Sequence, residues 1–319
     1  MDTHLYMGID QKRMNRFQYK QIIKWLIVFA IFFFLGKMVW KNWIQVKEAS
    51  FSFRPIPLIL SIFIFAFSYL IQVWAWYLIT LKLEIALSIR ETLESWFYSQ
   101  LGKYLPGKVW LLLGRFYLYE SKGKSKKLIS TALYFEMATI IIAGGIIFVA
   151  SLFLSQKTSY FFQGDQFSWF IFIFMIAFLF IHPRFLQKII NFFLFKFKGE
   201  TITLSISYID ILLILIVCVL AWMVGGVGFY LFVNSIYSIP SRHFLFFTGA
   251  LAVSSTLGLI AFFAPAGLGV REGAFVYLTG NLIPTPIAFV LSIATRLWMT
   301  LIEIGFIVGI YFYFRVKRK

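Results

Sequence analysis

Three basic side chains in the sequence surround a break in an otherwise apolar stretch. Lys103, Lys108 and Arg115 lie in GKYLPGKVWLLLGR, on either side of the helix-breaking residues Pro106 and Gly107. A broken helix frees backbone N–H and C=O groups, and helix N-termini attract anions. Arg forms a bidentate fork with phosphate oxygens, and Lys supplies a point charge. We therefore expect these cations to bind the headgroup of an anionic lipid; alternatively, they extend to the cytoplasmic interface and only anchor the segment.

A second break of the same kind lies in FAPAGLGVREG. It follows Pro265, and Gly267 and Gly269 allow another backbone or a ligand to approach closely. Arg271 and Glu272 come next, and adjacent residues on a helix point in different directions, so these two charges need not pair with each other. We expect Arg271 to contact substrate. The alternative is an exposed external loop with a solvated charge pair.

Three further ionisable residues lie inside apolar segments. Glu136 lies in LYFEMATI, whereas Arg296 and Glu303 lie seven residues apart in IATRLWMTLIEIGF, on one helical face. Such charges cost at least about 2.5–3.5 kcal/mol on the insertion scale and suggest function. We expect Arg296 to bind substrate and the carboxylates, Glu272 included, to pair with cations. The expected pairs are Glu303 with Arg296 or Arg271, and Glu136 with Lys108 or Arg115. A carboxylate that titrates could instead couple transport to protons, and pairs that only hold helices together are the structural alternative.

The sequence offers little for covalent chemistry. His4, His182 and His243 are scattered, and no Ser/His/Asp arrangement or cluster with metal-ligand spacing is present. A P-loop and a dinucleotide fingerprint are also missing. We expect a protein that is not an enzyme and that has no cofactor and no metal.

The composition is that of an integral membrane protein. Hydrophobic residues make up 61% of the chain and charged residues 13%, against roughly 25% charged in soluble domains. The formal net charge of +17 comes from cations in short loops between apolar runs, which indicates membrane topology and anionic headgroups rather than nucleic acid. We expect residues 1–319 to form one integral membrane domain, with no soluble domain.

Long apolar runs define the expected all-α, polytopic fold. Six full transmembrane helices are expected at 21–40, 56–81, 128–153, 167–182, 207–232 and 284–313. Clusters of Lys and Arg in both tails, in SKGKSKK and in 183–199 place both termini in the cytoplasm. The interrupted stretch 92–119 is too short for two crossings of about 20 residues each, so it is expected to be a re-entrant hairpin. A second re-entrant hairpin is favoured for 244–281, where two tilted crossings are also possible.

The two halves of the chain follow the same order. Residues 56–153 and 207–313 each read as a span, an interrupted hairpin and a span, and the two hairpins open to opposite sides. This is the pattern of an inverted-topology repeat, in which paired Gly/Pro-interrupted segments mark a transport site near the midplane of the bilayer.

The motifs GKYLPGKVWLLLGR, STALYFEM, PAGLGVREGAF and ATRLWMTLIEI resemble the membrane domain of lysylphosphatidylglycerol synthases, a flippase-like family of integral membrane proteins. The resemblance covers most of the chain from about residue 20 onward. The positions that carry it are Pro106, Gly107, Lys108, Gly114, Arg115, Glu136, Pro265, Gly267, Gly269, Arg271, Glu272, Gly273, Arg296 and Glu303.

The resemblance implies a protein of the inner (cytoplasmic) membrane that moves lipids between leaflets. In two-domain synthases the membrane domain is linked to flipping of aminoacylated phosphatidylglycerol, and a soluble transferase domain makes that lipid. This sequence ends at Lys319 without such a domain, so the synthase reaction is not expected here. Stand-alone relatives are associated with cell-envelope glycolipid or polyprenyl-phosphate pathways.

The expected function is therefore that of a lipid translocase. Its substrate would be an anionic, amino-acid-modified or sugar-modified phospholipid, or a polyprenyl-phosphate lipid. Its partners would be membrane lipids and a separate lipid-modifying synthase or glycosyltransferase, with no nucleic acid. One alternative is a membrane-embedded transferase with a lipid-linked donor, although the loops 41–55 and 154–166 offer only Glu48 and Asp165 as acids. The other is a non-transporting partner of a glycosyltransferase or synthase.

Overall fold

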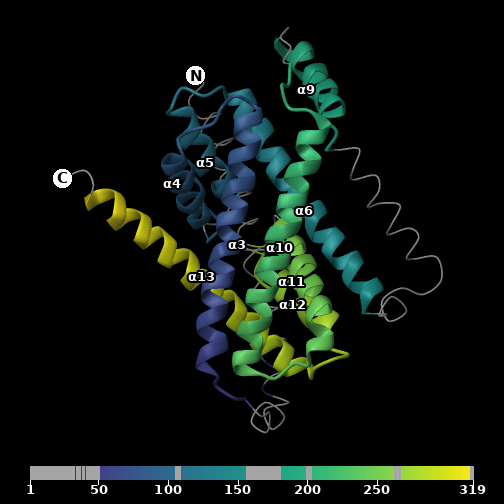
Figure 1. Cartoon of the computed structure of the whole chain (residues 1–319). Coiled ribbons are helices and arrows are strands. Elements are labelled where there is room, and N and C mark those ends of the chain that lie inside the picture. The colour runs from purple at the N-terminus through teal and green to yellow at the C-terminus, as the bar shows by residue number, and fades with distance from the viewer. Residues whose placement is uncertain are drawn as a thin grey trace, which may run out of the picture.

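The computed structural model describes residues 33, 37, 40, 51–104, 109–155, 181–198, 203–261, 264 and 267–316 (Figure 1). Within these residues the chain forms nine α-helices and two short 3₁₀-helices, without a strand. The expected all-α class is therefore confirmed for the described part of the chain.

Five helical segments are long and apolar enough to cross a membrane. They are α3 (Pro55–Lys82), α6 (Lys126–Leu154), α10 (Tyr208–Ile236), α13 (Thr285–Val316), and α11 (Phe244–Ile260) together with the preceding 3₁₀-helix η2 (Ser241–His243). A helix of 28 residues is about 42 Å long at 1.5 Å per residue, which exceeds the ~30 Å hydrocarbon core.

Four of the six expected spans correspond to α3, α6, α10 and α13. The expected spans at 21–40 and 167–182 lie almost entirely outside the described residues. Large apolar side chains such as Phe63, Trp74 and Leu301 are exposed on the outer faces of these helices. That exposure suits a surface that faces lipid rather than water.

The first interrupted stretch forms two short helices, α4 (Ile89–Gln100) and α5 (Val109–Glu120), with the 3₁₀-helix η1 (Leu101–Tyr104) after α4. Each α-helix has 12 residues and is about 18 Å long, which is shorter than the hydrocarbon core. The helices pack against each other, and Gly102 is needed there because an added Cβ would overlap the backbone of Trp110. Three expected site residues of this break, Pro106, Gly107 and Lys108, lie outside the described residues.

A capping box fixes the start of α4. The Ser88 hydroxyl accepts a hydrogen bond from the backbone N–H of Glu91, and the Glu91 carboxylate accepts one from the N–H of Ser88. The Lys122 ammonium also donates to Glu91, at 2.6 Å. Lys122 first, and then Ser88, hold the pKa of Glu91 at about 2, below its usual 4.5. The hairpin of α4 and α5 is thus closed at its outer end.

The second interrupted stretch contains α11 and the 10-residue helix α12 (Val270–Thr279). With η2, α11 is long enough to cross a membrane, so this stretch contains one crossing-length helix and one short helix. Gly267 and Gly269 between them have φ angles of +69° and +80°. A Cβ on Gly267 would also lie 2.5 Å from the carbonyl oxygen of Gly258, so this turn requires glycine. Pro265 lies outside the described residues.

The helices pack around a contact between α3 and α10, the most extensive in the bundle. It is close because Gly225 and Gly228 of α10 lie against Ser68 and Phe65 of α3. The helices α6 and α11 pack on the same assembly, and α13 crosses it to reach the α4–α5 hairpin, as Figure 1 shows. Most of the Lys- and Arg-containing stretch 183–199 forms the helix α9 (Pro183–Lys198) at one end of α10. The interior of the bundle is therefore bounded by helices from both halves of the chain.

Candidate functional site

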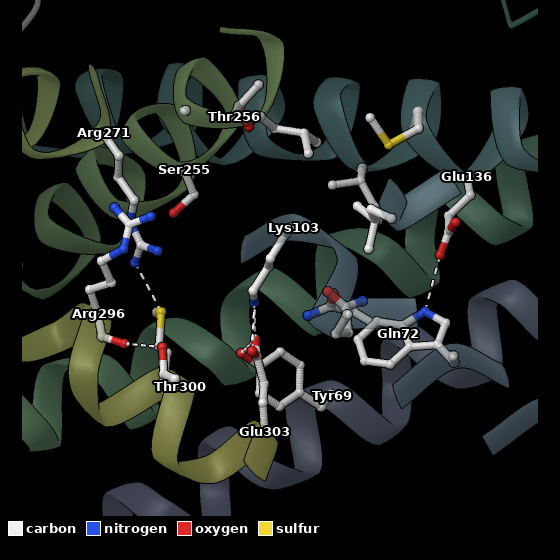
Figure 2. A pocket seen from close by; sticks show the side chains of 18 of the residues that line it. Tyr69, Gln72, Lys103, Glu136, Ser255, Thr256, Arg271, Arg296, Thr300 and Glu303 are labelled. Carbon is white, nitrogen blue, oxygen red and sulfur yellow. Dashed lines mark hydrogen bonds and ion pairs between the residues drawn. The ribbon is translucent and has the colours of Figure 1, made fainter. Parts of the chain in front are cut away.

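A cavity of about 220 Å³ lies inside this bundle, between the two interrupted stretches (Figure 2). Helices of both halves line it, from α3 near the N-terminal side to α13 near the C-terminus. Its charged lining side chains are Lys103, Arg115, Glu136, Arg271, Arg296 and Glu303. The structure thus brings together, in one cavity, all the expected site charges that it describes except Glu272, which contacts the cavity through Arg296.

The first charged group is centred on Arg115 in α5, whose side chain is almost completely buried. Its Nη1 donates to Glu136 in α6 at 2.5 Å, and Nε and Nη2 donate to the Ser99 hydroxyl at 3.2 and 3.1 Å. The guanidinium also lies over the rings of Trp76 and Trp96, 4.6 and 5.6 Å from their centroids. Hydrogen bonds, an opposite charge and two aromatic faces all stabilise this cation.

Glu136 is equally enclosed. Its second oxygen accepts a hydrogen bond from Trp96 Nε1 at 3.1 Å, so each carboxylate oxygen has a donor. Arg115 is one of the two partners expected for Glu136, and the other, Lys108, lies outside the described residues. Because a buried ion pair is tolerated only when its hydrogen bonds are satisfied, this pair is suited to holding α5 against α6.

The second charged group joins η1 to α13. Lys103 Nζ lies 2.5 and 2.6 Å from the two carboxylate oxygens of Glu303, and the Tyr69 hydroxyl donates to the same carboxylate at 2.5 Å. The sequence predicts Arg296 or Arg271 as the partner of Glu303, and Lys103 takes their place. The reason is that Glu303 lies two turns along α13 from Arg296, at the level of η1 rather than of α12.

The third group joins α12 to α13. Arg296 Nη1 donates to Glu272 Oε1 at 2.5 Å, and Glu272 Oε2 accepts the N–H of Gly269 at 2.7 Å. Glu272 is 1% exposed and therefore both caps α12 and neutralises Arg296. Its neighbour in sequence, Arg271, contacts the Met299 sulfur instead.

Arg271 differs from the other cations. Its Nη2 lies 2.9 Å from the Met299 sulfur, which is a weak acceptor, and no carboxylate among the described residues pairs with it. Figure 2 shows its guanidinium beside that of Arg296, and the two like charges repel each other. Arg271 is thus a cation in the cavity whose charge the described protein leaves uncompensated.

Uncharged polar side chains complete the lining. Gln72 of α3, Gln100 of α4, and Ser255 and Thr256 of α11 face the cavity. The Thr256 hydroxyl itself is buried against Gly144 of α6, so Gln72, Gln100 and Ser255 are the groups that offer donors. These groups are not among the site residues expected from the sequence, although a glutamine inside the apolar span SYLIQVW is a usable signal. The cavity therefore offers hydrogen-bond donors besides its cations.

The chemistry that this lining suits is the binding of an anion. Within the described ranges no three His, Cys, Asp or Glu side chains gather as a metal site would need. The lining carboxylates are held by cations, Tyr69 or Trp96, and the uncompensated group is a guanidinium. An acidic ligand would thus find a partner in the cavity without displacing an existing ion pair.

Comparison with known proteins assigns the chain to a family. No curated protein and no solved structure gives a significant match. The family model described as the lysylphosphatidylglycerol synthase TM region matches residues 21–305, which is most of the chain. Together with the five candidate spans, this match shows that the chain is a multi-pass membrane protein and belongs to the lysylphosphatidylglycerol synthase TM region family.

Proposed function

We propose that this protein translocates a lipid with an anionic headgroup between the leaflets of the inner membrane. The observation that carries the proposal is the charged cavity inside an apolar bundle, lined by cations from both halves of the chain. A headgroup would occupy the cavity while its acyl or polyprenyl chains remain in the bilayer. Placing the headgroup among fixed charges and dipoles lowers the cost of carrying it past the hydrocarbon core.

We infer that the two halves form an inverted repeat, which would supply the movement. In the first half, α3, the α4–α5 hairpin and α6 follow in order; in the second half, α10, the α11–α12 pair and α13 do so. In each half an ion pair joins the second hairpin helix to the next span: Arg115 with Glu136, and Glu272 with Arg296. In the first half the hairpin helix carries the arginine and the following span the glutamate, whereas in the second half the hairpin helix carries the glutamate and the span the arginine. Rocking of one half against the other would then open the cavity to each side in turn.

The two interrupted stretches contribute differently to this architecture. The short helices α4 and α5 favour a re-entrant hairpin, since neither reaches across the hydrocarbon core. For the second stretch, the crossing length of α11 with η2 favours one crossing, whereas the 10-residue helix α12 is too short for a second one and favours a re-entrant arrangement. Under both arrangements the described residues next to the breaks, such as Lys103 and Arg271, line the cavity, and irregular backbone is tolerated beside such a cavity.

The proposal includes no covalent chemistry. Lipid movement would be downhill or driven by an ion gradient, and the lipid would come from a separate synthase or glycosyltransferase. The Lys and Arg clusters of both tails favour cytoplasmic termini.

Reconstitution into proteoliposomes tests the proposal. A membrane-impermeant quencher reaches a tail-labelled fluorescent lipid only in the outer leaflet. Wild-type protein should therefore increase the rate at which lipid from the inner leaflet becomes quenched. The variant Arg271→Gln should lose this acceleration, whereas Arg90→Gln, which removes a cation from the surface pair with Glu94, should retain it. Wild-type rates equal to those of protein-free vesicles for every anionic and glycosylated lipid would overturn the proposal. Product formation from a lipid-linked sugar would favour a transferase instead.

A further inference from the structure

We infer that Arg271 is the anchor of a phosphate subsite on the α11–α12–α13 side of the cavity, and that this subsite selects a phosphodiester lipid carrying one negative charge. The inference rests on the proposed function because it names the class of headgroup that the cavity would hold.

One described cation of the cavity has no ion-pair partner among the described residues. Three ion pairs account for three of its four described cations: Lys103 with Glu303, Arg115 with Glu136, and Arg296 with Glu272. Arg271 remains, and its partner within the described residues is the sulfur of Met299. Guanidinium groups stay protonated in proteins, so Arg271 cannot escape its position by losing a proton. A cation held away from bulk water without an opposite charge is costly, and a bound anion removes that cost.

Other hydrogen-bond donors lie around Arg271. The Arg296 guanidinium lies beside it from α13, and Ser255 faces the same cavity from α11. These groups approach from α11, α12 and α13, the three helices that bound this side of the cavity. A planar carboxylate is satisfied by one guanidinium fork, whereas donors converging from three helices suit a tetrahedral phosphate.

The single positive charge of Arg271 determines which phosphate ester it matches. One uncompensated cation is neutralised by one negative charge, which is the charge of a phosphodiester. A phosphomonoester carries about −1.5 to −2 at pH 7 and would leave negative charge unmatched in the cavity. Phosphodiester lipids should therefore bind more tightly than phosphomonoester lipids, and lipids without phosphate should bind weakly.

Ligand-dependent thermal stability of delipidated, detergent-solubilised protein tests this subsite without measuring transport. The probes are short-chain phosphatidylglycerol as the diester, phosphatidic acid as the monoester, diacylglycerol without phosphate, and inorganic phosphate. Wild-type protein should be stabilised at the lowest concentration by phosphatidylglycerol. The variant Arg271→Gln should weaken this binding by at least about 10-fold, since a lost charge-assisted contact typically costs that much or more.

Two controls keep the result interpretable. The variant Arg90→Gln, with the same change of residue in the Glu94 surface pair, should bind phosphatidylglycerol as wild type does. Without ligand, Arg271→Gln should melt at the same temperature as wild type or higher, because it removes an uncompensated charge and leaves all three ion pairs intact. A misfolded variant would melt lower and is thereby recognised. The variant Arg271→Lys keeps the charge but loses the fork, so it should bind with intermediate affinity.

Each remaining outcome decides the inference. Equal phosphatidylglycerol binding by Arg271→Gln and wild type, or equal binding of diacylglycerol, would overturn the phosphate subsite. Tighter binding of phosphatidic acid would overturn the single-charge selectivity. If inorganic phosphate stabilised the protein at the same concentrations, and did so only when Arg271 is present, the ligand of the site would be the free anion. That result would overturn the claim that the site binds a lipid. If phosphatidylglycerol binds as expected but proteoliposomes show no flipping, the proposed function fails while the subsite stands.

Discussion

The two arginines that follow the helix breaks, Arg115 and Arg271, have opposite surroundings. Arg115 contacts a carboxylate, a hydroxyl and two tryptophan rings, and it is almost completely buried. Arg271 contacts a thioether and lies beside a second arginine. A satisfied ion pair fixes structure, whereas an uncompensated cation is suited to a ligand. We infer that the first break stabilises the cavity and that the second break holds the headgroup.

The residues around each arginine explain this difference. Aromatic side chains fill the space beside Arg115, where Trp76 and Trp96 are fully or almost fully buried. Small residues surround Arg271, since Gly258 lies against its side chain and Ser255 faces the same cavity. Large rings thus enclose Arg115 at the cavity wall, whereas small side chains border the cavity beside Arg271.

The largest expected effect on stability is at the first break. Arg115→Ala should reduce the free energy of unfolding by about 3–5 kcal/mol, because it leaves Glu136 buried without its cation. Equilibrium unfolding in mixed micelles measures this loss. Arg271→Gln should cost nothing in the same experiment. Similar losses for the two variants would remove the distinction between the two breaks.

A smaller loss is expected from glycine replacement in the second break. Gly267→Ala should lose about 2–4 kcal/mol, from the unfavourable positive φ angle and from overlap with the backbone of Gly258. Gly123 is a matched control, since its φ is +74° but no atom lies near an added Cβ. Gly123→Ala should therefore show the strain alone, about 1–2 kcal/mol. Equal losses at both positions would contradict the close approach of α11 to the Gly267 turn.

Removal of the ion pair between Lys103 and Glu303, which joins η1 to α13, should have an intermediate to small effect on stability. Glu303→Gln should lose about 1–3 kcal/mol, because it leaves the Lys103 ammonium beside a neutral amide but Lys103 is partly exposed. A double-mutant cycle with Lys103→Met measures the coupling between the two side chains. Additive losses from the two single variants would show that the pair does not join η1 to α13 energetically.

The smallest effect is expected at the outer end of the first hairpin. The pKa of Glu91 is about 2 in the folded protein and 4.5 ordinarily, so its ion pair with Lys122 stabilises the fold above pH 4.5. That contribution is lost as the pH falls from 4.5 toward 2. Thermal melting across this range should show a shallower acid dependence for Glu91→Gln than for wild type. Parallel curves for the two proteins would refute the lowered pKa.

Several features of the fold follow from local sequence. Runs such as 128–153 exceed the length of a bilayer crossing, so α6 could be predicted within a few residues. Glycines with positive φ, such as Gly267 and Gly269, mark a turn that no other residue adopts readily. Charges inside apolar spans, such as Glu136, identify the segments that surround a polar interior.

The pairing of those charges does not follow from local sequence. Lys103 and Glu303 are 200 positions apart, and their contact depends on the rotation of α13 against η1. The same rotation directs Arg296 to Glu272 rather than to Glu303. Helix rotation is set by packing over many side chains, such as the stacking of Phe97 on Phe306, and no short motif encodes it.

The most direct test of the central claim compares lipid flipping by wild-type protein, Arg271→Gln and Arg90→Gln in the same proteoliposomes. The probe is tail-labelled phosphatidylglycerol, and the rate is measured after addition of an impermeant quencher. We predict rapid flipping by wild type and Arg90→Gln, and a rate at least about 10-fold lower for Arg271→Gln. Flipping by Arg271→Gln at the wild-type rate would contradict the claim that this uncompensated arginine holds the headgroup.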